Sequence, residues 1–258
     1  MSDQPHCRTL RVLGLEKLGR ADFFHLVLED PGWVWTPGQF LMFRPDSWGL
    51  DPFGPRPFSI ADVDAQGLHL YIQAVGRGTR RLAELEPGEP VTVWGPLGQG
   101  FAYDQEQPLL LLAGGMGLAP FVGLIRSHLD PVRLELLFGH RQALDCYPFA
   151  ELETMTLAWH FQDTCPEDLQ LLRQAVQEKI RNYAEDGLVL ACGPLPFLRM
   201  IKTLGADCGA EVQISLETAM MCGIGACLGC AVPAEAGGHL QTCVQGPVFR
   251  ANEVRLGT

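Results

Sequence analysis

The sequence has little positive charge. Only 19 Lys and Arg residues stand against 30 Asp and Glu residues in a chain of 258, which gives a formal net charge of −11. So few cations cannot cover a phosphate backbone, and nucleic-acid binding is therefore not expected. The charged fraction is 19% and the hydrophobic fraction 47%, which excludes a disordered chain. A chain of this length is expected to form about two domains with their own cores.

The first residues form neither a basic segment nor an apolar one, so no export signal is expected. We therefore expect a cytoplasmic protein with reduced thiols. Its nine cysteines are then interpreted as metal ligands or redox groups before disulfides. The histidines show no metal-ligand spacing, and no Ser-His-Asp set or carboxylate pair indicates hydrolytic chemistry.

One uncharged run, residues 108–125, is long enough to span a membrane. It contains four glycines and two prolines, which do not suit a continuous helix. We expect instead a buried strand at 109–113, a tight turn at 114–117 and a helix at 118–129. No membrane span is expected.

Three segments of the chain differ in their sequence pattern. Residues 1–104 hold short β-rich runs between Gly and Pro, which predict an antiparallel barrel or sandwich with one short helix at 79–85, capped by Thr79. Residues 105–213 alternate strand and helix patterns, which predict a parallel sheet flanked by helices. Residues 214–258 are rich in small residues and Cys, so we expect a small unit held together by something other than a hydrophobic core.

The strongest motif is a set of four cysteines, Cys222, Cys227, Cys230 and Cys243, with the spacing C-x4-C-x2-C-x12-C. This spacing is typical of plant-type [2Fe–2S] ferredoxins. Glycines between the cysteines let the backbone fold closely around a cluster and direct amides at its sulfurs. A structural zinc site is the alternative, although zinc usually takes two C-x2-C pairs and only one is present.

A second pattern combines Arg-Pro-Phe-Ser at 56–59 with Gly-Arg-Gly-Thr at 76–79. The Arg is a fixed cation suited to a pyrophosphate. The Gly-x-Gly-Thr sequence, at the start of a short helix, offers bare backbone amides to a phosphate. Taken separately, an edge strand and an ordinary turn would also explain these two pieces.

A third motif, Gly-Gly-Met-Gly-Leu-Ala-Pro at 114–120, follows an expected strand and opens an expected helix, as a dinucleotide site requires. It departs from G-x-G-x-x-G because Pro120 takes the third glycine position. No ribose-binding acid follows the next strand, so NAD and NADP both remain open. A glycine turn needed only for packing is the alternative.

In this order, the motifs resemble those of the ferredoxin–NADP reductase superfamily, which also has a later C-G-P motif, here at 192–194. The chain is similar over nearly its whole length to dihydroorotate dehydrogenase B electron-transfer subunits, in which Gly-Pro-Val-Phe, here 246–249, follows the cluster motif. The resemblance implies a multidomain α+β and α/β fold. Its parts would be an antiparallel β-barrel FAD domain (1–104), a Rossmann-like NAD domain (105–213) and a small C-terminal [2Fe–2S] domain (214–258).

The same resemblance implies site residues. The FAD-binding residues would be Arg56, Pro57, Phe58, Ser59, Tyr71, Ile72, Gln73, Gly78 and Thr79. The pyridine-nucleotide residues would be Gly115, Gly117, Pro120, Cys192 and Gly193. Arg56 would bind the pyrophosphate and Ser59 would lie near the isoalloxazine. Gln73 stands where many relatives have a basic residue, and a buried structural thiol is the alternative for Cys192.

The implied function is electron transfer from the FMN of a dihydroorotate dehydrogenase catalytic subunit, through [2Fe–2S] and FAD, to NAD+ in pyrimidine biosynthesis. The implied assembly is a heterotetramer with two copies of each subunit. One alternative keeps the cofactors but places the chain in a sulfide dehydrogenase, hydrogenase or electron-bifurcating complex. Another is a zinc-stabilised nucleotide-binding module without redox activity.

Overall fold

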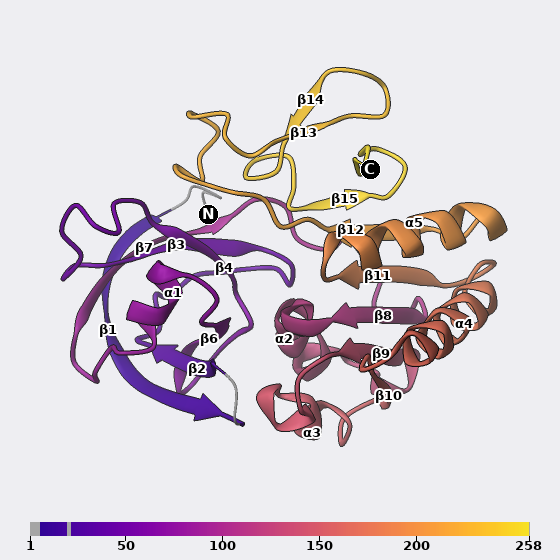
Figure 1. The fold of residues 1–258 in the computed structure, drawn as a ribbon, viewed down its shortest axis with the longest axis horizontal. Helices are drawn as coiled ribbons and strands as arrows, with labels where there is room; N and C mark the ends of the chain where they lie inside the picture. The colour runs from indigo at the N-terminus through magenta and orange to yellow at the C-terminus, as the bar shows by residue number, and fades with distance from the viewer. Residues whose placement is uncertain (1–5, 20–21, 258) are drawn as a thin grey trace.

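The computed structural model describes residues 6–19 and 22–257, which form two large sheets and a small hairpin (Figure 1). The ends of the first and third expected domains, residues 1–5 and 258, lie outside the described residues, as do residues 20 and 21. The yellow C-terminal segment lies beside both large sheets (Figure 1).

The first sheet is a strongly curled antiparallel barrel with the strand order β4-β3-β7-β1-β2-β6-β5. Its strands are β1 (His6–Leu18), β2 (Phe23–Leu28), β3 (Phe40–Pro45), β4 (Arg56–Ser59), β5 (Asp62–Asp64), β6 (Gly67–Gln73) and β7 (Pro90–Leu97). The edge strands β4 and β5 are joined by Ile60 and Ala61. The Ile60 N–H donates to the Gln39 carbonyl and the Ala61 N–H to the His69 carbonyl, each at 3.1 Å. The chain itself therefore closes the curl, and the expected barrel is confirmed.

The short helix in this barrel begins earlier than expected. Helix α1 (Arg77–Leu82) has Gly76 as its N-cap, and Thr79 is the third helical residue. The Thr79 hydroxyl accepts a hydrogen bond from the Gly76 N–H at 3.0 Å. The predicted start and the predicted cap are both wrong, because a Thr that caps from inside the first turn has the same local sequence as one that precedes it.

The second sheet has the order β10-β9-β8-β11-β12-β15, and its first five strands are parallel. Its elements are β8 (Leu109–Gly114), η1 (Gly115–Leu118), α2 (Ala119–Ser127), η2 (Pro131–Arg133), β9 (Leu134–His140), η3 (Leu144–Cys146), α3 (Phe149–Leu152), β10 (Leu157–Gln162), α4 (Pro166–Asn182), β11 (Leu188–Cys192), α5 (Leu195–Cys208) and β12 (Val212–Ser215). The run at 108–125 thus folds as strand, turn and helix, as expected. In the part of the chain that the structure describes, no helix is long and apolar enough to cross a membrane.

Alternate residues of the central strand β8 pack on opposite faces of this sheet. Leu109 and Leu111 join a buried cluster with α2 and α3, whereas Leu110 and Leu112 join one with α4 and α5. Because both faces are covered, the strand reads as a continuous apolar run rather than an alternating one.

The C-terminal segment is partly built into the second sheet. It contains the hairpin β13 (Ala231–Pro233) and β14 (His239–Gln241), then β15 (Val248–Arg250), which pairs antiparallel with β12. Phe249 and Val254 pack in the same buried cluster as α5. The expectation that no hydrophobic core holds this segment is therefore wrong for residues after β14. The division at 213/214 stays a proposal from the sequence; it falls within β12, and the pairing of Gln213 with Arg250 runs across it.

The buried position of β8 generates a stability prediction. Leu111 is 0% exposed, so we expect Leu111→Ala to destabilise the protein by about 2–5 kcal/mol through lost burial and the cavity left behind. Leu157 on the edge strand β10 is 57% exposed, so Leu157→Ala should change stability by less than about 0.5 kcal/mol. Urea unfolding followed by tryptophan fluorescence measures both, and equal losses would contradict the packing described.

Candidate functional site

A cavity of about 350 Å³ lies between the barrel, the second sheet and the start of the C-terminal segment. It gathers eight of the predicted cofactor residues, which are Pro57, Phe58, Ser59, Tyr71, Ile72, Gln73, Thr79 and Cys192. Met116 and Ala119, from the predicted nucleotide motif, line the same cavity. Residues expected to bind two different cofactors therefore face one space, as direct hydride transfer would require.

Arg56 and Gly78 do not line this cavity but lie against each other beside it. The Arg56 Nη1 donates to the carbonyls of Gly54 at 2.8 Å and Pro55 at 3.0 Å, and its guanidinium lies 5.6 Å from the centre of the Trp48 ring. A Cβ on Gly78 would lie 2.8 Å from Arg56 Nε. The missing side chain of Gly78 thus leaves the space in which the guanidinium sits, next to the first turn of α1.

The predicted nucleotide residues meet at the carboxyl ends of β8 and β11, where open α/β sheets bind ligands. A Cβ on Gly117 would lie 2.2 Å from the Cys192 carbonyl oxygen, so the glycine turn fits tightly against the end of β11. Gly115 has a φ of +54°, and Pro120 is buried in the first turn of α2. Packing therefore accounts for part of the glycine motif, which was the alternative to a dinucleotide site in the sequence analysis.

Gly193 completes this contact from the β11 side. Its φ is +157°, and a Cβ there would lie 3.0 Å from Gly114. The loop after β11 thus lies directly against the backbone at the end of β8. Cys192, at the end of β11, is only 2% exposed, and burial, together with the charge of Glu217, raises the pKa of its thiol.

The structure adds residues that the sequence analysis missed. Glu217 and Thr218 line the cavity just after β12. The Glu217 side chain is open to the cavity but surrounded by protein, and this burial raises the pKa of its carboxyl. The Thr218 Oγ1 is buried and has no hydrogen-bond partner among the described residues. Neither residue belongs to a sequence motif, so no local pattern could have found them.

The four predicted cluster cysteines come together as two pairs. The sulfurs of Cys230 and Cys243 are 3.2 Å apart, and the Cys227 N–H donates to the Cys222 sulfur at 3.4 Å. Among the described residues, no three metal-binding side chains converge on a point that could hold one ion. Paired thiols suit a two-iron cluster, in which each iron takes two thiolates, better than a single tetrahedral zinc.

Backbone amides point at these sulfurs, as a buried anionic cluster needs. The Gly225 N–H donates to the Cys243 sulfur at 3.2 Å. At Cys222, burial raises the pKa, but the amides of Ile224 and Cys227 outweigh it and lower the pKa to about 7. The loop therefore stabilises thiolate at its first ligand, and the donor set fits an iron–sulfur cluster.

The cluster loop packs directly on the barrel. Cys230 and Cys243 share a buried cluster with Phe40, Met42 and Leu97 of β3 and β7. Phe40 also lines the cavity described above, so its ring belongs both to the cavity wall and to the buried cluster that contains two of the four cluster cysteines.

Two further contacts fix this loop on the barrel. Trp94 Nε1 of β7 donates to the Cys222 carbonyl at 3.0 Å. A Cβ on Gly223, which has a φ of +72°, would lie 2.5 Å from the Met42 Cγ. Only glycine allows the loop to come this close with this backbone conformation.

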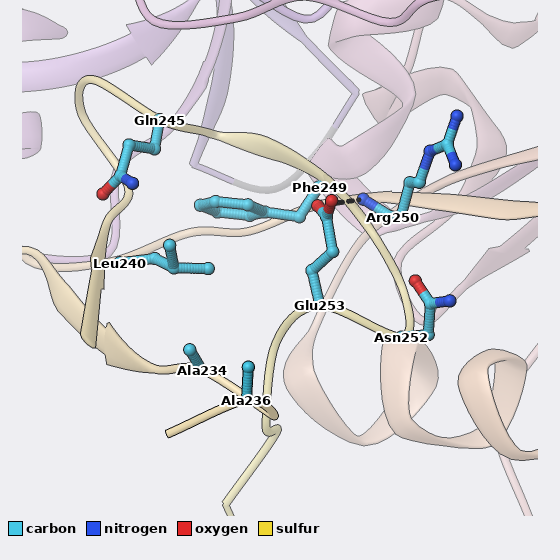
Figure 2. A pocket seen from close by; sticks show the side chains of 8 residues that line it. All are labelled: Ala234, Ala236, Leu240, Gln245, Phe249, Arg250, Asn252 and Glu253. Carbon is cyan, nitrogen blue, oxygen red and sulfur yellow. Dashed lines mark hydrogen bonds between the residues drawn. The ribbon is translucent and has the colours of Figure 1, made fainter. Parts of the chain in front are cut away.

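A second cavity, of about 560 Å³, lies between the β13–β14 hairpin and β15 (Figure 2). None of the predicted cofactor residues lines it. Its charged residues are Arg250 and Glu253, and the Glu253 carboxylate already accepts a hydrogen bond from the Arg250 N–H at 3.2 Å. Because the predicted cofactor residues line the other cavity, this one is not the candidate for the redox site.

Comparisons with known proteins agree with the two halves of this site. The family model described as "Iron-sulfur cluster binding domain of dihydroorotate dehydrogenase B" matches residues 217–255. The model described as "Oxidoreductase NAD-binding domain" matches residues 111–203. All four predicted cluster cysteines fall in the first match, and the glycine turn at 114–120 falls in the second.

Similar proteins cover nearly the whole chain. The "Dihydroorotate dehydrogenase B (NAD(+)), electron transfer subunit" of Caldanaerobacter subterraneus is 32% identical over 248 residues, which are 95% of this chain and 96% of that protein. The chain belongs to the family of dihydroorotate dehydrogenase B electron transfer subunits. The "Dihydroorotate dehydrogenase B (NAD(+)), electron transfer subunit homolog" of Aquifex aeolicus is 33% identical to this chain over 224 residues, which are 85% of this chain and 86% of that protein. The sequence-based family assignment is thus confirmed.

Solved structures support the fold. The structure of a NADH-dependent reduced ferredoxin-NADP oxidoreductase matches with a TM-score of 0.82 and 23% identity, covering 96% of this chain and 90% of that one. A ferredoxin NADP+ reductase from Neisseria gonorrhoeae matches with a TM-score of 0.61 and 17% identity, covering 83% and 93%. The expected reductase-like fold is confirmed, while the roles of individual site residues stay predictions.

The contact between Gly78 and Arg56 generates a prediction for flavin binding. In Gly78→Ala the new methyl group would displace the guanidinium, so we expect about tenfold weaker FAD binding in reconstitution titrations followed by flavin fluorescence. Gly14→Ala in β1 is the matched control, because a Cβ on Gly14 would have nothing within 4 Å. Equal FAD affinity in the two variants would remove Arg56 from the flavin site.

Proposed function

We propose that this chain carries electrons from the FMN of a dihydroorotate dehydrogenase catalytic subunit, through a [2Fe–2S] cluster and FAD, to NAD+ in pyrimidine biosynthesis. The observation that carries the proposal is the shared wall between the cavity and the cluster cysteines. Phe40 and Met220 line the cavity and also pack with Cys230 and Cys243. Electron transfer between the two sites would cross little more than these side chains.

In this proposal FAD occupies the cavity and the nicotinamide approaches from the loops after β8 and β11. Arg56 would bind the pyrophosphate, Ser59 would face the flavin ring, and Cys192 would lie beside the nicotinamide. When bound, FAD supplies the exchange between hydride and single electrons that the cluster cannot supply alone. The protein positions these groups and excludes water. Glu217, whose pKa is raised, can hold a proton at the cavity wall.

The surface around the cluster supports a protein partner. Four apolar side chains there, which we name the cluster rim, are strongly exposed. They are Met221 (48%), Ile224 (57%), Leu228 (58%) and Val244 (43%). Exposed apolar groups gathered at one place mark interaction sites. The FMN-containing catalytic subunit would cover the rim, in a cytoplasmic assembly with two copies of each subunit.

Leu228 carries a second sign of function. Among the described residues it is the only one other than glycine with a positive φ, at 58°. This conformation is strained for leucine and is kept where a site requires it. Here it presents an apolar side chain between the ligands Cys227 and Cys230, at the point where a partner would approach the cluster.

The test of the proposed function is a spectrum and an assay on the purified protein. We expect flavin absorption with a cluster shoulder that dithionite bleaches, and NAD+ reduction by dihydroorotate once the FMN-containing subunit is added. A colourless, zinc-containing protein would contradict the proposal. Intact cofactors with a different electron-donating partner would move the chain to another redox complex.

Removal of one cluster ligand should separate the two halves of the path. In Cys227→Ser we expect loss of the cluster signal and of dihydroorotate-dependent NAD+ reduction, because the cluster alone links the flavin to the partner. FAD content and NADH-dependent dye reduction should stay unchanged. Cys208→Ser, in α5 away from the cluster, serves as control. Loss of FAD in Cys227→Ser would contradict the separate seating of the cofactors.

Leu228→Asn should weaken the complex without harming the fold. Asparagine tolerates the left-handed conformation better than leucine, but it removes an apolar contact, so we expect about tenfold weaker binding of the catalytic subunit by calorimetry. Leu171→Asn is the control, because Leu171 is 56% exposed on α4, outside the cluster rim. Unchanged affinity in Leu228→Asn would place the interface elsewhere.

A further inference from the structure

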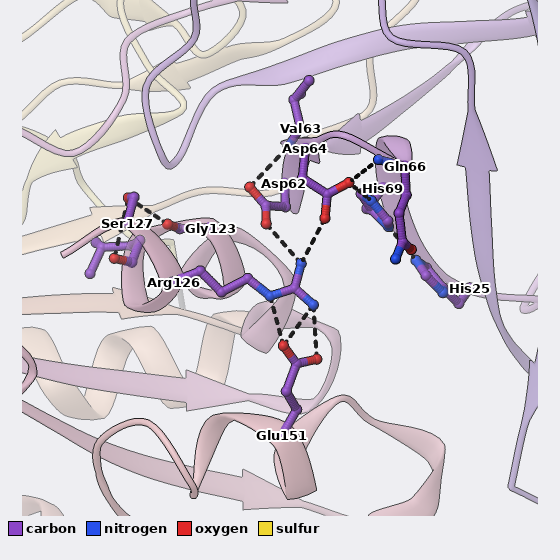
Figure 3. Close-up of polar contacts among 11 residues, drawn as sticks. His25, Asp62, Val63, Asp64, Gln66, His69, Gly123, Arg126, Ser127 and Glu151 are labelled. Carbon is purple, nitrogen blue, oxygen red and sulfur yellow. Dashed lines mark hydrogen bonds and ion pairs between the residues drawn. The ribbon is translucent and has the colours of Figure 1, made fainter.

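Arg126 joins the barrel to the second sheet through three carboxylates (Figure 3). It lies in the last turn of α2. Its Nη1 donates to Asp62 Oδ2 at 2.7 Å and lies 3.8 Å from Asp64 Oδ2, both on β5 of the barrel. Its Nε and Nη2 donate to the two oxygens of Glu151, on α3, at 2.7 and 2.9 Å.

This arrangement is more constrained than an ordinary surface ion pair. The Arg126 side chain is 26% exposed and that of Asp62 is 12% exposed, so solvent screens the contact only in part. The fork on Glu151 fixes the plane of the guanidinium. The remaining nitrogen, Nη1, then points toward β5 in a single direction. This direction sets the orientation of the barrel relative to α2.

The opposite end of α2 reaches the cofactor cavity. Ala119, its first residue, and Met116, in the preceding η1, line that cavity. The Gly123 N–H donates to the Ala61 carbonyl at 2.7 Å. A Cβ on Gly123 would lie 2.5 Å from Trp35 Cη2, so helix and barrel touch closely at mid-helix. We call Arg126 and its three carboxylates the Arg126 clamp. A rotation of α2 about the mid-helix contact would move both this clamp and the cavity wall at Ala119.

The barrel side of the clamp also leads to the cavity. Asp64 Oδ1 lies 2.8 Å from His69 Nε2, and His69 Nδ1 lies 2.9 Å from His25 Nε2. Because a carboxylate only accepts, His69 donates from Nε2 to Asp64, and its Nδ1 shares a hydrogen bond with His25 Nε2. The His25 ring stacks on Tyr71 with centroids 4.5 Å apart, and Tyr71 lines the cavity.

His25 is uncharged in this chain of contacts. Burial first, then His69 and Arg126, lower the pKa of His25 to about 4. Its neutral ring can therefore lie flat against Tyr71 without a counterion, and the hydrogen bond to His69 fixes its orientation. Asp64 thus connects Arg126 to one wall of the cavity, while α2 connects Arg126 to another.

We propose that Arg126 is a positioning residue that holds the nucleotide-binding sheet against the flavin-binding barrel in the geometry that hydride transfer requires. This inference rests on the proposed function. Arg126 touches neither cofactor site, and it acts through Asp62 and Asp64 on one side and through α2 on the other. Small misplacements of reacting groups cost large factors in rate, so the effect should appear in the transfer step rather than in binding.

The test uses the full chain loaded with FAD and cluster, and stopped-flow reduction of the flavin by NADH. In Arg126→Met we expect hydride transfer to slow by about 10- to 100-fold, with the NADH concentration at half-maximal rate within about twofold of wild type. Arg126→Lys keeps the charge but cannot hold the carboxylates in a fork. Its rate of hydride transfer should therefore fall between those of wild type and Arg126→Met.

Arg133→Met is the matched control, because it also removes one guanidinium. Arg133 pairs with Asp130, close by in the same sheet unit, at 3.2 Å. We expect wild-type rates in this variant. Asp62→Asn, which weakens a single arm of the clamp, gives a second measurement if Arg126→Met folds poorly, and it should slow transfer in the same direction.

Two kinetic outcomes overturn the inference. One is a wild-type rate of flavin reduction in both Arg126→Met and Asp62→Asn, and the other is a loss confined to NADH affinity. If wild type itself fails to oxidise NADH, the proposed function fails instead. Hydrogen exchange then decides on the clamp alone: faster exchange of residues 60–64 and 119–127 in Arg126→Met supports it, and unchanged exchange overturns it.

Discussion

Close backbone approach at three glycines is the constraint on which this arrangement of sites depends. At Gly117 the turn after β8 lies against the Cys192 carbonyl, at Gly123 helix α2 lies against the barrel, and at Gly223 the cluster loop lies against Met42. Each position would bring a Cβ to 2.5 Å or less of another group. Gly123 and Gly223 thus join the second sheet unit and the cluster loop to the barrel, while Gly117 brings together the ends of β8 and β11 within the second sheet.

Ion pairs then restrict the rotation between the barrel and the second sheet that the backbone contacts alone would allow. Rigid placement of two packed units within one chain is not the default. Arg126 adds directional contacts at the edge of this interface, away from the cavity. The C-terminal segment adds a third constraint, because it pairs with β12 and packs on β3 and β7. Three separate attachments around the cavity limit rotation about any one of them.

The sequence predicted those parts of the structure that are encoded by local pattern. The cluster spacing, the apolar run of β8 and the glycine turn each depend on neighbouring residues, and each lies where expected. The start of α1 was misplaced because Thr79 caps the helix from within. Glu217 and the Arg126 clamp were missed because their partners are distant in sequence and come together only in the fold.

Strand β15 pairs with β12, and the cluster segment leaves the sheet at one of these strands and returns at the other. The segment is therefore an excursion between two neighbouring strands, anchored at both ends on one sheet. Closing a longer excursion between fixed ends adds little entropic cost. A reductase of this fold can thus acquire, lengthen or lose a segment that carries a one-electron cluster at this edge of the sheet, while the order of its other strands stays the same.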